Sequence, residues 1–248
     1  GLLHIKDRDE WDNPGYSVAR ISRNLGKQSY VGVIGTKGNA LSPEDNSIAG
    51  IDLQLASSEI QGSKTLVYSL YGLKSFTDSI HSGDISWGTE INYPNDFLDI
   101  RAGIMEIGKN FTPGLGFVPR KNIRNLYGGA DLGIRPEKYG ILRIRTGASY
   151  LFVHELGSGD LLTSEIDVGI LRTDFLSGDE IRFSWQSQYE KLQEDFTIFQ
   201  DIIIPMGEYQ FNRFELNLQS ARRRKLWGEV EFSRGSFYSG NRTGLELG

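Results

Sequence analysis

The 248-residue chain contains no cysteine and only three histidines. Without cysteine, a disulfide framework, a Cys-ligated zinc site and a thiol nucleophile are excluded. The histidines are His4, His81 and His154, and His154-Glu155 lacks the second histidine of an H-E-x-x-H zinc motif. Neither a P-loop nor a G-x-S-x-G nucleophile elbow is present. We therefore expect no bound metal, no cofactor and no catalytic centre of the kinds that these sequence motifs mark.

Long apolar runs are also missing. A membrane-spanning helix needs ~20 largely apolar residues, whereas the longest apolar runs here are a few residues, as at Ile202–Ile204. If the chain crosses a membrane, it must do so with strands, since only helices and closed barrels pair every backbone group in hydrocarbon. The 27 Lys+Arg and 32 Asp+Glu residues give a net charge of −5. A nucleic-acid partner is not expected, because such a domain is usually basic.

Alternation of apolar and polar residues is the main pattern present. In residues 84–93, Ile85, Trp87 and Ile91 share one side, opposite Asp84 and Glu90. This period of two predicts strands, and no long window has helical periodicity. The predicted strands are 16–25, 29–38, 47–57, 64–76, 84–93, 98–107, 126–136, 140–153, 162–174, 181–190, 208–220, 226–234 and 237–247. The chain is therefore predicted to be all-β, a single domain over 1–248 with about thirteen strands.

The links between these strands alternate in length. Short links lie near 26–28, 58–63, 94–97, 137–139, 177–180 and 221–225, and longer ones near 39–46, 77–83, 108–125, 155–161 and 191–207. Short turns at one end and long loops at the other are typical of an up-and-down antiparallel transmembrane β-barrel of an outer membrane. Because such barrels usually have an even number of strands, we expect a fragment of a larger barrel, incomplete at one or both ends.

The polar sides of the strands carry both signs of charge, and arginine (17) outnumbers lysine (10). In a barrel of at least fourteen strands these side chains would surround water rather than fill the interior. The predicted lumen-lining residues are Asp99, Arg101, Asp131, Arg135, Arg143, Arg145, Glu165, Asp167, Arg182, Glu190, Arg213 and Glu215. Glu165 and Asp167 are also the candidate pair for a glycosidase-like site, although a lumen-lining role is favoured.

Three further segments carry specific expectations. Arg222, Arg223, Arg224 and Lys225 form one basic run, which loop parity assigns to a short periplasmic turn. The link 191–207 is unusually apolar, and we favour an extension of its hairpin over folding into the lumen or docking a partner. Aromatic residues near strand ends, Trp87, Tyr127 and Trp227 among them, are candidates for interfacial girdles.

Three stretches carry a family resemblance: NYPNDF at 92–97 with NFTPGLGFVPR at 110–120, ARISRNLGKQSYVG at 19–32, and GSFYSG at 235–240. They resemble the C-terminal barrel domain, of unknown function, of large Gram-negative outer-membrane proteins that carry an N-terminal carbohydrate-binding family 9-like module. The chain lacks that module and stops where more strands are expected. The resemblance implies an outer-membrane location and a link to glycan handling.

The sequence thus favours an outer-membrane barrel, either porin-like or an anchoring module, whose partners are membrane lipid and polar solutes or glycans. The alternative is a soluble or surface-exposed all-β protein that binds or hydrolyses carbohydrate. Its polar strand faces would then meet bulk water, as in a β-sandwich.

Overall fold

The structure, a computed structural model, describes residues 1–6, 15–40, 42, 44–60, 62–77, 82–199, 202–238 and 240–248. His81 lies outside them. The described part of the chain contains β-strands and no helix. The strands are β1 (Leu2–Lys6), β2 (Gly15–Asn24), β3 (Tyr30–Lys37), β4 (Asn46–Ile60), β5 (Lys64–Thr77), β6 (Ile85–Pro94), β7 (Leu98–Ile107), β8 (Ile123–Ile134), β9 (Ile141–Glu155), β10 (Leu161–Phe175), β11 (Glu180–Leu192), β12 (Phe196–Phe199), β13 (Ile202–Ile204), β14 (Gly207–Gln219), β15 (Glu229–Phe237) and β16 (Gly240–Leu247). No helix in these ranges is long and apolar enough to span a membrane.

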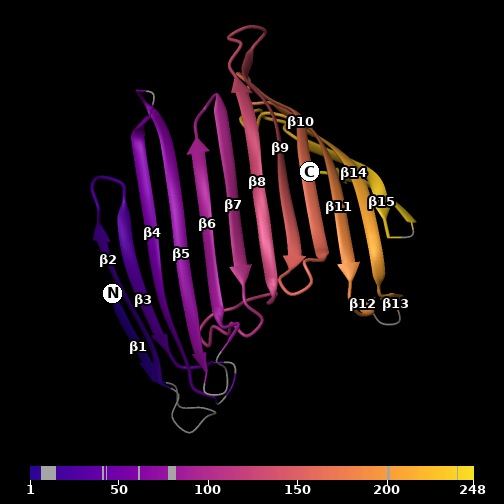
Figure 1. The fold of residues 1–248 in the computed structure, drawn as a ribbon. Helices are drawn as coiled ribbons and strands as arrows, with labels where there is room; N and C mark the ends of the chain where they lie inside the picture. Colours follow the sequence, from indigo (N-terminus) through magenta and orange to yellow (C-terminus); the bar gives the residue numbers. More distant parts are fainter. Residues whose placement is uncertain are drawn as a thin grey trace. The chain divides into compact units, whose positions relative to one another are not determined.

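Fourteen strands form one sheet in chain order, β1 to β11 and then β14 to β16, while β12 and β13 pair with each other. Every recorded pairing is antiparallel, so the predicted all-β, up-and-down antiparallel fold is confirmed (Figure 1). The sheet is open, with β1 and β16 at its edges, and is consistent with a fragment of a barrel. The sequence analysis missed β1, β12 and β13, all of which are short.

The chain divides into two compact units, which are described separately. Unit 1 comprises Gly1–Tyr93, Ala102–Asn125 and Glu155–Gly159, and unit 2 comprises Pro94–Arg101, Leu126–His154 and Asp160–Gly248. We define the polar face of unit 1 as the face of Asp52 and Ser75, and that of unit 2 as the face of Glu165 and Asp167. The opposite face of each unit is its apolar face.

The predicted alternation of link lengths is largely confirmed. Links 25–29, 61–63, 95–97 and 176–179 define a short-link end, and links 38–45, 108–122 and 193–206 define a long-link end. The rule fails in two places. Link 135–140 at the short-link end is slightly longer than link 156–160 at the long-link end, and near the C-terminus β14–β15 is joined by 220–228 and β15–β16 by 238–239 alone. Within the link 193–206, β12 and β13 form a small hairpin, but as a separate two-stranded sheet rather than as a continuation of the β11–β14 pairing, and Phe196 of β12 lines a cavity on the polar face of unit 2.

Burial in unit 1 is inverted with respect to a water-soluble protein. On β6, Ile85 and Ile91 on the apolar face are 49% and 46% exposed, whereas Ser86 on the polar face is 4% exposed. Asp84, which directly precedes β6 and is bonded to Ser75 of β5, is also buried. Exposed apolar side chains continue across the neighbouring strands as Val33, Ile51, Leu55, Leu70 and Phe76. The polar side of this sheet is therefore the packed side.

The link 108–122 is what covers this polar side. Its backbone N–H groups at Thr112 and Gly114 donate to Ser75 Oγ (3.2 Å) and to Asn46 Oδ1 (2.9 Å). In return Asn46 Nδ2 donates to the Thr112 carbonyl at 2.9 Å, and the link's Phe111 is 2% exposed. The link thus folds back over β4 and β5 instead of extending away from the sheet.

Replacement of Asn46 tests this arrangement. Asn46→Ala leaves the Gly114 N–H and the Thr112 carbonyl without their partner in a buried place, so we expect a loss of about 1–3 kcal/mol in unfolding free energy. Trypsin should then cleave the link faster at Lys109, Arg120 or Lys121. The exposed Asn24→Ala is the control, and equal cleavage of both variants would contradict the role given to Asn46.

Candidate functional site

The predicted lumen-lining residues gather on the polar face of unit 2. Strand register places Asp167 opposite Gln186 and Gln186 opposite Arg213, and it also pairs Glu215 with Ser184 and Glu190 with Thr163. Directly paired residues share a face, and side chains two apart do so too. The face therefore includes Arg143, Arg145, Glu165, Asp167, Arg182, Glu190, Arg213 and Glu215.

Three of the remaining four predicted residues join them through side-chain contacts and strand alternation, and Arg135 is bonded to Asp96, which also contacts Arg143 of this face. A Cβ on Gly147 would lie 2.3 Å from Asp131 Oδ1, so the Asp131 carboxylate extends over that glycine. The Arg101 guanidinium lies 6.0 Å from the centre of the Tyr127 ring, and Asp99 is two residues before Arg101 on β7. Tyr127 is four residues before Asp131 on β8, so strand alternation puts both, and the Arg101 beside Tyr127, on the polar face rather than on the apolar face where a girdle residue is expected.

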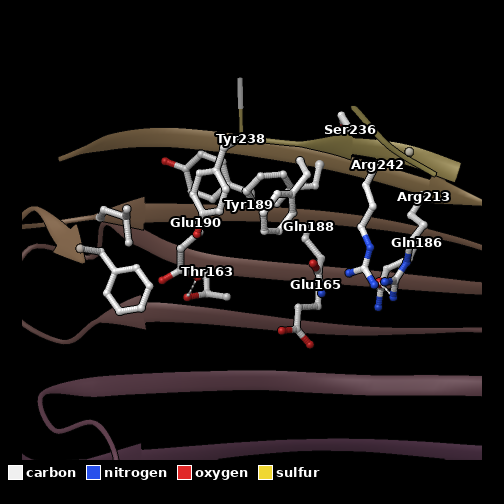
Figure 2. A pocket seen from close by; sticks show the side chains of 15 residues that line it. Thr163, Glu165, Gln186, Gln188, Tyr189, Glu190, Arg213, Ser236, Tyr238 and Arg242 are labelled. Atoms are coloured by element: carbon white, nitrogen blue, oxygen red, sulfur yellow. Dashed lines mark hydrogen bonds between the residues drawn. The ribbon is translucent and has the colours of Figure 1, made fainter. Parts of the chain in front are cut away.

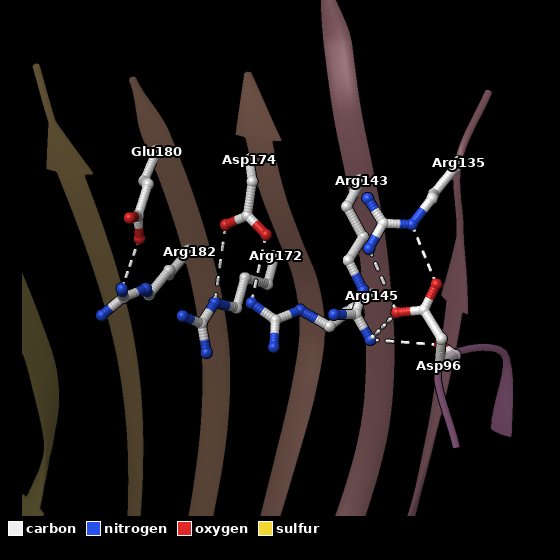
Figure 3. Close-up of polar contacts among 8 residues, drawn as sticks. All are labelled: Asp96, Arg135, Arg143, Arg145, Arg172, Asp174, Glu180 and Arg182. Atoms are coloured by element: carbon white, nitrogen blue, oxygen red, sulfur yellow. Dashed lines mark hydrogen bonds and ion pairs between the residues drawn. The ribbon is translucent and has the colours of Figure 1, made fainter. Parts of the chain in front are cut away.

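Arginines are concentrated at the short-link end of this face (Figure 3). Arg145, Arg172 and Arg182 form one cross-strand row, which we call the arginine row, and Arg143, Asp174 and Glu180 form the next row. Arg145 donates to Asp174 at 3.1 Å, and Arg182 is ion-paired with Glu180. At the edge of the cluster, Asp96 accepts from Arg135 at 2.8 Å and lies 3.2 Å from Arg143.

A β-bulge explains why sequence alternation missed Arg172 and Asp174. The register of β10 shifts between Gly169 and Leu171 on the β11 side. One extra residue moves every later side chain to the opposite face, so Arg172 and Asp174 join the face of Asp167. Strict alternation would have placed them with Ile166 and Val168. The glycine at 169 was the available signal, since an isolated glycine in a strand often marks a bulge.

A cavity of about 420 Å³ lies toward the long-link end of the same face (Figure 2). We call it the ring–arginine pocket. On the floor of the pocket, Gln186 bridges two side chains. Its Nε2 donates to Asp167 Oδ1 at 2.7 Å, and its Oε1 accepts from Arg213 at 2.8 Å. The lining residues include Thr163, Glu165, Gln188, Glu190, Phe211, Phe237, Tyr238 and Arg242.

One end of the pocket is aromatic. Tyr238 packs edge-to-face on both Phe211 and Phe237, with 4.9 Å between ring centres in each pair, and on Tyr209 at 5.0 Å. Tyr238 has a φ of 49°, a left-handed conformation that costs about 1–3 kcal/mol for a residue other than glycine. Burial of its phenol and the negative charge of Glu190 raise the Tyr238 pKa above 10.0. The ring contacts hold this strained residue in place.

Sequence reasoning found the charged residues of the pocket but not its aromatic end or Arg242. The rings come from β14, β15 and the link after β15, which only strand pairing brings together. The candidate carboxylate pair is also placed: Asp167 is bonded to Gln186, and Glu165 lines the pocket. Among the described residues, no group of three His, Asp or Glu side chains is arranged to hold a metal ion.

The basic run at 222–225 joins two short links. Arg224 donates both Nη1 and Nη2 to the Asp179 carboxylate at 2.6 Å, and Arg223 donates to the Leu176 carbonyl at 3.2 Å. Asp179 also accepts from Ser177 Oγ and from the Ala221 N–H, and these bonds lower the Asp179 pKa to about 2. The prediction that this run belongs to a short-link-end turn is confirmed, within the longer link 220–228.

In comparisons with known proteins, no family model, curated protein or solved structure matches the chain. The geometry of the polar face therefore carries the functional argument.

The Asp179 contacts predict a pH-dependent variant effect. Because the folded-state pKa lies below the ordinary value of ~3.9, the Asp179 bonds stabilise the fold above that pH and lose their effect as pH falls through about 2. Asp179→Asn should lower the urea unfolding midpoint at neutral pH, and the difference from wild type should shrink toward pH 2. Glu194→Gln, an exposed carboxylate in a link, is the control and should have no such pH profile.

Proposed function

We propose that this chain is part of a transmembrane β-barrel of a Gram-negative outer membrane, with its apolar face against lipid and its polar face toward an aqueous lumen. The lumen would pass or bind polar solutes. Long links would be extracellular and short links periplasmic, as in known bacterial barrels.

The inverted burial is the observation that carries this proposal. On the polar faces of the two units, Asn46, Ser75, Ser86, Asn217 and Ser233 are buried. Large apolar side chains on the opposite faces are exposed, and they form continuous surfaces across neighbouring strands. Contiguous apolar surface on this scale marks a membrane or partner surface rather than a water-facing one.

The boundary of the apolar face in unit 2 supports a bilayer as the neighbour. Toward the long-link end, the contiguous apolar run ends at a different row on successive strands: Phe152 on β9, Ile166 on β10, Trp185 on β11, Phe214 on β14, Phe232 on β15 and Leu245 on β16. Residues that pair across neighbouring strands form one row of the sheet. Phe152 is in the row that contains Tyr189 of β11, whereas Leu245 is in the row that contains Phe183 of β11.

This boundary crosses the strands obliquely. From β9 to β16 it moves six residues along the strands over five strand spacings. With ~3.3 Å per residue and ~4.8 Å per strand, the shift corresponds to a tilt of ~40°. Strands of membrane barrels tilt by ~35–45°, so a flat membrane surface would meet this sheet along such a line.

Within this proposal the two ends of the lumen wall differ in charge. Five arginines face three carboxylates near the short-link end, whereas the pocket near the long-link end combines carboxylates, arginines and rings. In unit 1 the link 108–122 would narrow the lumen. The resemblance to barrels of carbohydrate-binding outer-membrane proteins agrees with passage or anchoring of glycans and stays a prediction.

The competing proposal is a soluble carbohydrate-binding protein. Substitutions at two adjacent positions on β5 distinguish it from a membrane barrel. Leu70 is on the apolar face and Ser69 on the polar face. In a bilayer, Leu70→Arg should cost about 2–4 kcal/mol, whereas Ser69→Arg should be close to wild type. Urea unfolding in lipid vesicles measures both.

A soluble protein predicts a different pattern. An exposed Leu70→Arg would change stability by no more than ~0.5 kcal/mol, and the protein would fold without detergent. Outer-membrane fractionation and heat-modifiable gel migration give independent readouts. Equal tolerance of the two substitutions in a detergent-free, soluble protein would refute the barrel.

A further inference from the structure

We propose that the ring–arginine pocket binds an acidic saccharide, a neutral sugar ring linked to one that carries a carboxylate. This inference rests on the proposed function and names the class of solute. The proposed barrel is needed only to say from which side of the membrane the ligand enters.

Two arginines at one end of the pocket supply the anion site. Arg213 and Arg242 are both opposite Gly235 in the strand register, one on each neighbouring strand, so no side chain separates them. In Figure 2 both guanidinium groups lie at the same end of the pocket as Gln186. Arg213 bonds the neutral Gln186, and neither arginine forms an ion pair among the described residues. Two convergent guanidinium groups match a carboxylate, which accepts paired N–H donors.

The other end of the pocket suits a sugar ring. Phe211, Phe237 and Tyr238 present aromatic surface, on which the C–H face of a pyranose can pack. Beside the rings, Glu190 accepts from Thr163 Oγ1 at 2.8 Å, and Gln188 lines the same wall. Carboxylate and amide oxygens accept hydrogen bonds from hydroxyl groups.

The spacing between the two ends sets the ligand's length. Gln186 at the arginine end and Glu190 at the aromatic end are four residues apart on β11, which is ~13 Å along a strand. This span exceeds one pyranose and fits two linked rings. Glu165 and Glu190 would repel a second carboxylate near the aromatic end. The favoured ligand therefore has a single carboxylate at one end.

The pocket lies toward the long-link side, where Leu192 and Phe196 are also among its lining residues. Its residues Arg213, Phe237 and Arg242 come from β14, β15 and β16. Each lies closer to the long-link end than the residue at which the apolar face of its strand ends; these end residues are Phe214, Phe232 and Leu245. In the proposed orientation the pocket is at the extracellular mouth of the lumen. The strain at Tyr238 is retained there because its ring forms the wall of the site.

Calorimetry on the purified whole chain in detergent tests the proposal with an aldobiouronic acid, glucuronate linked to xylose. Its methyl ester and neutral xylobiose are the matched ligands. We expect the acid to bind about tenfold or more tightly than its ester, since hydrogen bonds to charged groups are the stronger ones. Arg242→Gln should remove this preference, while Arg234→Gln, the same charge change on the opposite face of β15, should keep it.

Tyr238→Gly separates binding from folding. Glycine adopts a positive φ without strain, so this variant should remain folded and should lose affinity for the acid and the ester alike. Absence of acid binding, equal affinity for acid and ester, or an unchanged preference in Arg242→Gln would overturn the proposal. None of these results would affect the barrel itself, which the Leu70→Arg and Ser69→Arg comparison decides separately.

Discussion

The whole structure depends on lateral hydrogen bonding between strands whose two faces have opposite polarity. Because the backbone groups of the inner strands are paired with neighbouring strands, the sheet needs no water between its two edges, and its faces are free to meet different surroundings. The exposed Ile51, Leu70 and Ile85 on one side, and the buried Asn46, Ser75 and Ser86 on the other, define those surroundings. In the proposed barrel, lipid outside and a polar lumen inside would satisfy both faces at once.

Covering the polar face requires specific hydrogen bonds rather than general apolar packing. The link 108–122 reaches Asn46 and Ser75 through its backbone N–H groups, which replaces water at buried polar atoms. At the other end, Asp179 and Arg224 tie two links together. Two kinds of link contact therefore stabilise the fold, one over the polar face and one between neighbouring links, and link lengths alone do not reveal either role.

Local irregularities of the backbone position the chemistry of the polar face. The bulge after Gly169 turns Arg172 and Asp174 toward Arg145 and completes the arginine row. At the opposite end, the left-handed Tyr238 closes the tight β15–β16 link and directs its ring onto Phe211 and Phe237. A regular sheet of the same composition would have neither the dense arginine cluster nor the aromatic end of the pocket.

The sequence by itself determined the long strands and most of the polar face, because a period of two is a local property. The assignments of Arg143, Glu165 and Asp167 to one face follow directly from it. Only the tertiary structure decided the membership of Arg172 and Asp174, since a single bulge reverses alternation. It alone brought Arg213, Arg242 and Tyr238 into one pocket, because residues from three strands meet only through register, which depends on all the cross-strand hydrogen bonds together.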